Sequence, residues 1–115
     1  MIAVIFEVEP APKRRADYLA AAAALKPLLQ RIDGFISVER FQSLTNPDKI
    51  LSLSFFRDED AVKAWRNTTE HRNAQAAGRG GIFKGYRLRI AAVVRDYGLH
   101  DRDHAPGDSR AAHGL

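Results

Sequence analysis

The chain has 115 residues, 45% of them hydrophobic, a composition that suits one globular domain and excludes wholesale disorder. It contains no cysteine, which excludes disulfide bonds, thiol nucleophiles, cysteine-bound zinc and iron–sulfur clusters. The net charge of +4 comes from basic residues scattered among acidic ones, so we expect no nucleic-acid partner. No apolar stretch approaches the roughly 20 residues of a membrane-spanning helix, and no secretory signal is evident, so we expect a cytoplasmic protein without membrane contact.

The first two predicted elements are a strand and a helix. Residues 2–8 alternate with the period of a strand, and two prolines at positions 10 and 12 end it because neither can donate to a sheet ladder. Residues 14–32 then show helical spacing, with one apolar stripe made of Tyr18, Ala22, Leu25, Leu29 and Ile32. Pro27 removes one helical hydrogen bond and predicts a kink or a broken last turn near residues 23–26, and Gly34 supplies the stop.

A hairpin, a second helix and a last strand follow. Residues 35–44 and 50–57 are predicted strands, joined by a turn with the sequence Thr-Asn-Pro-Asp. Asp58 has the side chain of an N-cap and begins a helix predicted to run to about residue 77. The last strand is predicted over residues 86–97.

The order of these elements is β-α-β-β-α-β. It predicts an α+β, ferredoxin-like fold with a four-stranded antiparallel sheet and both helices on one face. The opposite face is then uncovered although it carries apolar side chains, so we expect a homodimer that covers it. After Gly98 the chain becomes polar and aperiodic, so we expect a domain over residues 1–97 and a C-terminal tail over residues 98–115, loose or lying along the partner.

The second predicted helix carries the candidate site. Its sheet-facing stripe is apolar in the first half, at Ala61 and Trp65, and polar in the second half. The polar side chains there are Asn67, Thr68, His71, Arg72 and Gln75. Burying such groups without partners costs about 1–3 kcal/mol each, so the pattern indicates a cavity that holds water or a ligand. The alternative is that this end of the helix projects past the sheet into solvent.

Several catalytic templates are missing from the sequence. There is no phosphate-binding loop, no dinucleotide fingerprint and no nucleophile elbow. His71 is the only histidine outside the tail, and the tail histidines His100, His104 and His113 match no metal-ligand spacing. We therefore expect no metal site built from protein ligands alone.

Four segments together resemble the antibiotic biosynthesis monooxygenase family. They are IDGFISVE (residues 32–39), LSLSFFRD (51–58), WRNTTEHRNAQAAGR (65–79) and FKGYRLRI (83–90). The resemblance extends over residues 1–97 and implies a dimeric α+β barrel made from two ferredoxin-like sheets. Family members include cofactor-independent monooxygenases of aromatic polyketides, quinol oxygenases and haem-degrading enzymes.

The resemblance implies a cofactor-independent monooxygenase that acts on a small aromatic, polyketide or quinone-type substrate with O₂. A deprotonated substrate of this kind itself reduces O₂, so the protein needs only to bind it and to stabilise an oxyanion. On this hypothesis Asn67, His71 and Arg72 are catalytic, as polar donor, proton acceptor and fixed positive charge. Trp65, Thr68 and Gln75 would bind the substrate, with the indole as a stacking wall.

Two alternative functions remain open. One is a haem-binding or haem-degrading monooxygenase, although those relatives have an asparagine on the first strand, where this chain has Phe6 and Glu7. Their iron-ligating histidine also lies about three turns after the tryptophan, whereas His71 follows Trp65 by only six residues. The other is a non-catalytic dimeric protein that binds a small ligand or serves in a stress response.

Overall fold

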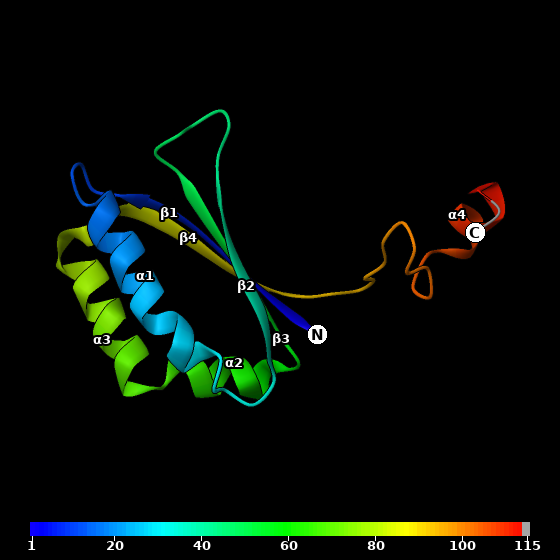
Figure 1. Cartoon of the computed structure of the whole chain (residues 1–115), viewed down its shortest axis with the longest axis horizontal. Coiled ribbons are helices and arrows are strands. Elements are labelled where there is room, and N and C mark those ends of the chain that lie inside the picture. Colours follow the sequence, from blue (N-terminus) through cyan, green and yellow to red (C-terminus); the bar gives the residue numbers. More distant parts are fainter. Residues whose placement is uncertain (114–115) are drawn as a thin grey trace.

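The computed structural model describes residues 1–113, and Figure 1 shows how its elements are arranged. In chain order they are β1 (Ile2–Pro10), α1 (Arg15–Leu29), β2 (Phe35–Gln42), β3 (Ile50–Phe56), α2 (Glu59–Arg66), α3 (Thr69–Ala77), the wide turn η1 (Gly78–Ile82), β4 (Phe83–Ala92) and α4 (Gly107–His113). The four strands form one antiparallel sheet in the order β2-β3-β1-β4. Helices α1, α2 and α3 cover one face of it. The predicted ferredoxin-like α+β fold is therefore confirmed.

The core lies between this sheet face and the helices. One cluster packs Leu29 of α1 and Val62 of α2 against Phe56 of β3. A second cluster packs Tyr18 of α1 against Val8 and Ile50, which pair across β1 and β3. The predicted apolar stripe of the first helix is thus the stripe that α1 buries, because helical spacing places Tyr18 and Leu29 on the same side.

The first helix differs from the prediction at Pro27. Helix α1 runs through Pro27 to Leu29, and the N–H of Gln30 still donates to the carbonyl of Lys26 at 3.1 Å, so the last turn is not broken. The predicted helix end at residues 32–34 is wrong, because α1 ends at Leu29 with Gln30 as its C-cap. Gly34 does have the expected left-handed conformation, with a φ of 89°, but it lies in the turn before β2. A Cβ at Gly34 would lie 2.9 Å from the Cβ of Ala61, so this glycine also lets α2 approach closely.

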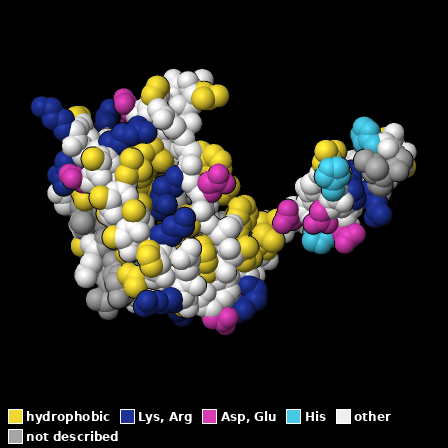
Figure 2. All heavy atoms as spheres, viewed as in Figure 1, with side chains coloured by type: hydrophobic (Ala, Val, Ile, Leu, Met, Phe, Trp, Pro, Cys, Tyr) yellow, Lys and Arg dark blue, Asp and Glu magenta, His cyan; other side chains and the backbone are white. Residues whose placement is uncertain are grey.

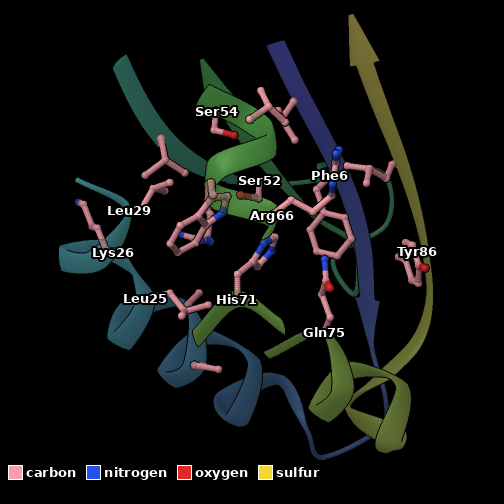
Figure 3. A pocket seen from close by; sticks show the side chains of 18 of the residues that line it. Phe6, Leu25, Lys26, Leu29, Ser52, Ser54, Arg66, His71, Gln75 and Tyr86 are labelled. Atoms are coloured by element: carbon pink, nitrogen blue, oxygen red, sulfur yellow. The ribbon is translucent and has the colours of Figure 1, made fainter. Parts of the chain in front are cut away.

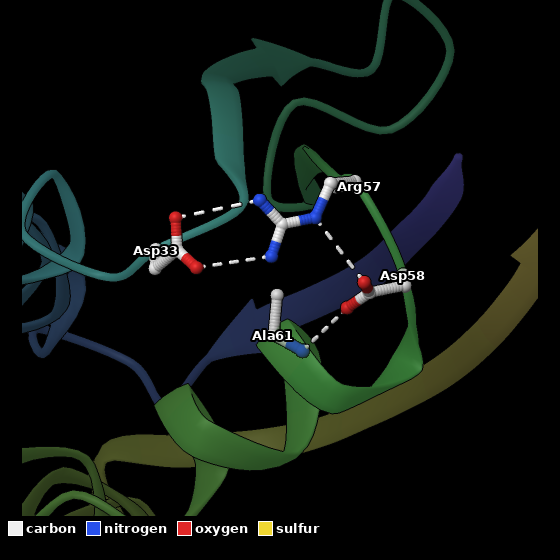
Figure 4. Close-up of polar contacts among 4 residues, drawn as sticks. All are labelled: Asp33, Arg57, Asp58 and Ala61. Atoms are coloured by element: carbon white, nitrogen blue, oxygen red, sulfur yellow. Dashed lines mark hydrogen bonds and ion pairs between the residues drawn. The ribbon is translucent and has the colours of Figure 1, made fainter.

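An ionic clamp joins the loop before β2 to the start of α2 (Figure 4). Both terminal nitrogens of Arg57 donate to the Asp33 carboxylate, at 3.3 and 3.0 Å, and its Nε donates to Asp58 at 3.2 Å. The other Asp58 oxygen accepts from the N–H of Ala61 at 2.9 Å, which confirms the predicted N-cap. These contacts lower the pKa of Asp33, mainly through its hydrogen bonds with Arg57.

The predicted second helix is in fact two helices. Helix α2 ends at Arg66 and α3 begins at Thr69. The reason is Thr68, whose hydroxyl donates to the Trp65 carbonyl at 2.9 Å and accepts from the N–H of His71 at 3.2 Å. A threonine that caps a new helix in this way competes with continuation of the old one.

The last strand begins and ends earlier than predicted. It spans Phe83–Ala92 because its partner β1 spans Ile2–Pro10, and the ladder runs from the pair Pro10 and Phe83 to the pair Ile2 and Ala92. Beyond it, the N–H of Val93 donates to the carbonyl of Met1 at 3.0 Å, where β1 begins. A strand extends only as far as its neighbour can pair with it.

The C-terminal segment runs away from the body of the molecule (Figure 1). The Cα radius of gyration is 16.7 Å, compared with about 13 Å expected for a compact chain of this length. The segment makes contacts within itself: the Arg102 guanidinium lies 5.1 Å from the Tyr97 ring centre, and the N–H of Gly98 donates to Asp101 at 2.7 Å. It ends in α4, an element that the aperiodic sequence did not indicate.

Candidate functional site

A cavity of about 310 Å³ lies between the helices and the sheet (Figure 3). All four strands and helices α1, α2 and α3 contribute to its wall. Most of the wall is apolar, and it includes Val4, Phe6, Leu25, Val38, Leu88 and Ile90. A cavity of this size and character is typical of a small-molecule site.

The cavity opens along the edge strand β4. Tyr86, Leu88 and Ile90 line it, and yet they are 56%, 50% and 43% exposed. They point to the helix-covered face, because Leu88 and Ile90 pair with the cavity-lining residues Phe6 and Val4. A ligand can therefore enter over these three side chains.

Two serines on β3 help to make room for the cavity. Ser52 and Ser54 alternate with Ile50 and Phe56 on the face of β3 that meets the helices. Small side chains at two consecutive inward positions leave space that larger apolar residues would fill. The alternation of small and large residues over positions 50–56 is a sequence signal that could have indicated this space.

Trp65 and His71 form an aromatic stack in the wall of the cavity. Their ring centres are 4.8 Å apart and their planes differ by 15°. Trp65 lies in the last turn of α2, and His71 lies in the first turn of α3. The stack therefore depends on the break at Thr68, which starts a new helix and brings the imidazole back over the indole.

The His71 ring is neutral at neutral pH. Burial lowers the pKa of His71 from its ordinary 6.5, and the positive charges of Arg72 and Arg66 lower it further. The backbone carbonyl of Trp65 has the opposite effect and raises this pKa in part. Its Nδ1 is enclosed and makes no hydrogen bond within the described residues. An uncharged imidazole beside a cavity is able to accept a proton.

Gln75 is the third predicted residue that the structure brings into the cavity. It lies one helical turn after His71, and both side chains point from α3 towards Phe6 of β1 (Figure 3). The Arg72 Nη1 donates to Oε1 of Gln75 at 3.2 Å, which fixes the orientation of the amide.

The other three predicted residues, Asn67, Thr68 and Arg72, are not among the described residues that line the cavity. Arg72 is exposed, and its Nη2 donates to Oδ1 of Asn67 at 2.5 Å. Thr68 caps α3. All three make hydrogen bonds at the junction between α2 and α3, next to the cavity-lining residues Trp65, His71 and Gln75.

The cavity is also lined by three basic side chains that the sequence did not single out. They are Lys26 of α1, Arg40 of β2 and Arg66 of α2. Arg40 is the one that the sequence could have indicated, because it follows Val38 by two residues and so lies on the inward face of its strand. In the space-filling view, Lys and Arg side chains lie among hydrophobic ones in the middle of the body (Figure 2).

The described residues hold neither a metal-binding cluster nor a membrane-spanning helix. No cluster of three or more histidine or acidic side chains that could hold a metal ion occurs among the described residues. Within residues 1–113, no helix combines the length and the apolar character needed to cross a membrane.

Comparisons with known proteins identify relatives of the chain. The family model for antibiotic biosynthesis monooxygenase matches residues 1–77. Jasmonate monooxygenase ABM of Pyricularia oryzae is 48% identical over 94 residues, which are 82% of this chain and 44% of that protein. The uncharacterised protein YqjZ of Bacillus subtilis is 30% identical over 80 residues, 70% of this chain and 63% of that protein. The chain thus spans less than two thirds of the length of either relative.

Solved structures share the fold at low sequence identity. Rv0793 from Mycobacterium tuberculosis matches with a TM-score of 0.76 and 18% identity, covering 84% of this chain and 98% of that one. SnoaB, a cofactor-independent oxygenase from Streptomyces nogalater, matches with a TM-score of 0.72 and 10% identity, covering 83% of this chain and 94% of that one. These matches concern the fold alone.

Proposed function

The chain belongs to the antibiotic biosynthesis monooxygenase family, and from this premise we propose that it oxidises a small aromatic, polyketide or quinone-type substrate with O₂ and without a bound cofactor. The observation that carries the proposal is the neutral His71 imidazole, stacked on Trp65 in the wall of an apolar cavity.

The first step is binding. The substrate lies against the apolar wall, with its ring on the Phe6 and Trp65 side of the cavity. Aromatic side chains favour a flat apolar ligand, and they add the energy of ring contacts to that of burial. Gln75, oriented by Arg72, supplies a polar contact that fixes the ligand's position.

The second step is removal of a proton from the substrate. Since Nδ1 of His71 is enclosed, Nε2 is the nitrogen that accepts it. The resulting carbanion or phenolate is electron-rich, and the positive charges of Arg40 and Arg66 in the cavity wall stabilise it.

The third step is the reaction with O₂. For an anthrone-type substrate, the carbanion gives its electrons to O₂ and forms a carbon–oxygen bond as a peroxide. The O–O bond then breaks, one oxygen stays on carbon as a carbonyl, and the other leaves as water with both hydrogens of the original CH₂ group. The substrate loses four electrons and O₂ gains four, so no other reductant is required.

The test is oxygen consumption by the purified full chain with anthrones, quinols and jasmonate, the last because of the relative named for it. We expect turnover of one class without added cofactor, and a decrease of at least tenfold in His71→Gln, about 1.4 kcal/mol of transition-state stabilisation. Trp65→Phe should retain stacking and most of the turnover. If no substrate supports oxygen uptake, the oxygenase proposal is wrong and a non-catalytic binding protein is favoured. A shift of the Soret band when hemin is added would favour the haem alternative.

We also propose that the chain forms a homodimer through the face of the sheet opposite the helices, here called the open face. Its apolar side chains are Ile5, Phe41, Leu51, Leu53 and Phe55, which alternate with residues of the covered face. Such a patch on a small sheet favours a partner. The tail runs away from its own body, and in the proposed dimer we expect it to lie along the partner.

A further inference from the structure

The wall of the cavity has a one-sided charge distribution. Lys26, Arg40 and Arg66 line it, whereas no aspartate or glutamate lines it among the described residues. The polar side-chain groups that remain in the described wall are hydroxyls, the Gln75 amide, the Trp65 indole N–H and the His71 ring, and the last is neutral at neutral pH. The described part of the cavity wall therefore carries a net positive charge.

The two arginines come from opposite layers of the fold. Arg40 lies on β2 in the sheet, paired in register with Ser52 of β3, and Arg66 lies in the last turn of α2. The Nε of Arg40 is enclosed and makes no hydrogen bond within the described part of the chain. A ligand between sheet and helix can thus meet a guanidinium on each side.

A guanidinium in a mostly apolar wall is stabilised best by an anion. Loss of hydration is costly for a buried charge unless an opposite charge or hydrogen-bond acceptors replace the water. The planar guanidinium matches the two oxygens of a carboxylate, and in a cavity of low polarity the pair is stronger than at the surface. The enclosed Nε of Arg40 is a donor that still needs such an acceptor.

We propose that the natural ligand of this cavity is an apolar carboxylate, ionised before it binds, whose carboxylate pairs with Arg40 and Arg66. Its apolar body lies against the aromatic and aliphatic wall. This inference deepens the proposed function and rests on it only for the assignment of the same cavity as the substrate site. A ligand that is neutral when it binds would leave the enclosed Nε of Arg40 without an acceptor, whereas Arg66 is exposed and is hydrated until an anion binds.

The test compares three probes of one shape and different charge on the full chain: 2-naphthoate, neutral 2-naphthalenemethanol and cationic 2-naphthylmethylamine. Isothermal titration calorimetry at neutral pH should show 2-naphthoate binding at least tenfold more tightly than the alcohol, and the amine binding more weakly than either. Arg40→Gln and Arg66→Gln should each weaken 2-naphthoate at least tenfold, equal to about 1.4 kcal/mol, and change the alcohol less than twofold. Arg31→Gln, which removes an exposed guanidinium outside the cavity, should change neither.

Equal affinities for the three probes would overturn the inference, and so would arginine variants that fold and bind 2-naphthoate as the wild type does. The comparison of the three probes uses only the wild-type chain, so it tests the carboxylate preference even if an arginine variant fails to fold. The naphthalene probes do not depend on oxygen chemistry. If the chain prefers 2-naphthoate but takes up no oxygen with any substrate, the oxygenase proposal is wrong and the carboxylate site is supported. If it takes up oxygen but does not prefer 2-naphthoate, the carboxylate site is wrong and the oxygenase proposal is supported.

Discussion

The imidazole of His71 lies parallel to the indole of Trp65, with ring centres 4.8 Å apart, although the two residues belong to different helices. One threonine between them makes this possible. Thr68 ends the turn that carries Trp65 and caps the turn that carries His71. The position of the candidate base His71, and with it the burial that lowers its pKa, therefore depends on the helix break at Thr68.

The pH dependence of stability should report the environment of His71. Because burial lowers its pKa in the folded chain, the unfolded chain takes up the proton first as the pH falls through about 6.5. The stabilising contribution is therefore complete above that pH and is lost progressively below it. Urea unfolding at about pH 7.5 and about pH 5.5 should show a smaller loss for His71→Gln than for the wild type.

This comparison isolates one group. Among the described residues, the charged side chains that face or adjoin His71 are those of Lys26, Arg40, Arg66 and Arg72, and none of them is a histidine or a carboxylate. The three tail histidines contribute equally to both proteins and cancel in the difference. If His71→Gln loses as much stability as the wild type on acidification, the folded-state pKa of His71 is not lowered.

The cap at Thr68 should be measurable as stability. Thr68→Val keeps the shape but removes both hydrogen bonds of the hydroxyl, and we expect a loss of about 1 kcal/mol in the free energy of unfolding. Thr68→Ser keeps the hydroxyl and should retain most of the wild-type free energy of unfolding. Thr45→Val, in the exposed hairpin turn, is the matched control. Emission from Trp65, the chain's single tryptophan, should change in Thr68→Val alone, and an unchanged spectrum with unchanged stability would count against the cap.

The open face should mediate dimer formation. Light scattering at micromolar concentration should give about twice the 12.8 kDa mass of the chain. Leu53 lies in the middle of this face, paired with Ile5 on one side and Glu39 on the other, so Leu53→Asp should yield monomers that keep their circular dichroism spectrum. Leu19→Asp, on the outside of α1, should remain dimeric. A wild-type chain that is monomeric at this concentration would disprove the proposed assembly.

The tail should be dispensable for folding. Its contacts with the domain are with the last two domain residues: the Arg102 guanidinium lies over Tyr97, and the Asp96 N–H donates to His104 Nδ1 at 3.4 Å. A chain that ends after Tyr97 should melt within a few degrees of the full chain, as followed by circular dichroism. Loss of cooperative unfolding would show instead that residues beyond Tyr97 support the core.

The sequence by itself determined the order and kind of the main elements. Alternation over residues 2–8, the stripe through Tyr18 and Leu29, the N-cap at Asp58 and the left-handed conformation of Gly34 are local signals, and the structure has all of them. They can be predicted because each depends on neighbours within one or two turns of the chain. The order β-α-β-β-α-β then leaves few ways to cover a four-stranded sheet.

Only the tertiary structure decided where helices and strands end and which polar groups meet. The last strand ends at Ala92 because β1 begins at Ile2, a limit that lies 90 residues earlier in the chain. Arg40 and Arg66 are remote in sequence, and they share a cavity because β2 lies at the sheet edge opposite β4 while α2 covers the same face. Alternation along β2 indicates that Arg40 lies on the inward face, but its meeting with Arg66 depends on the sheet order and on the packing of α2 against the sheet.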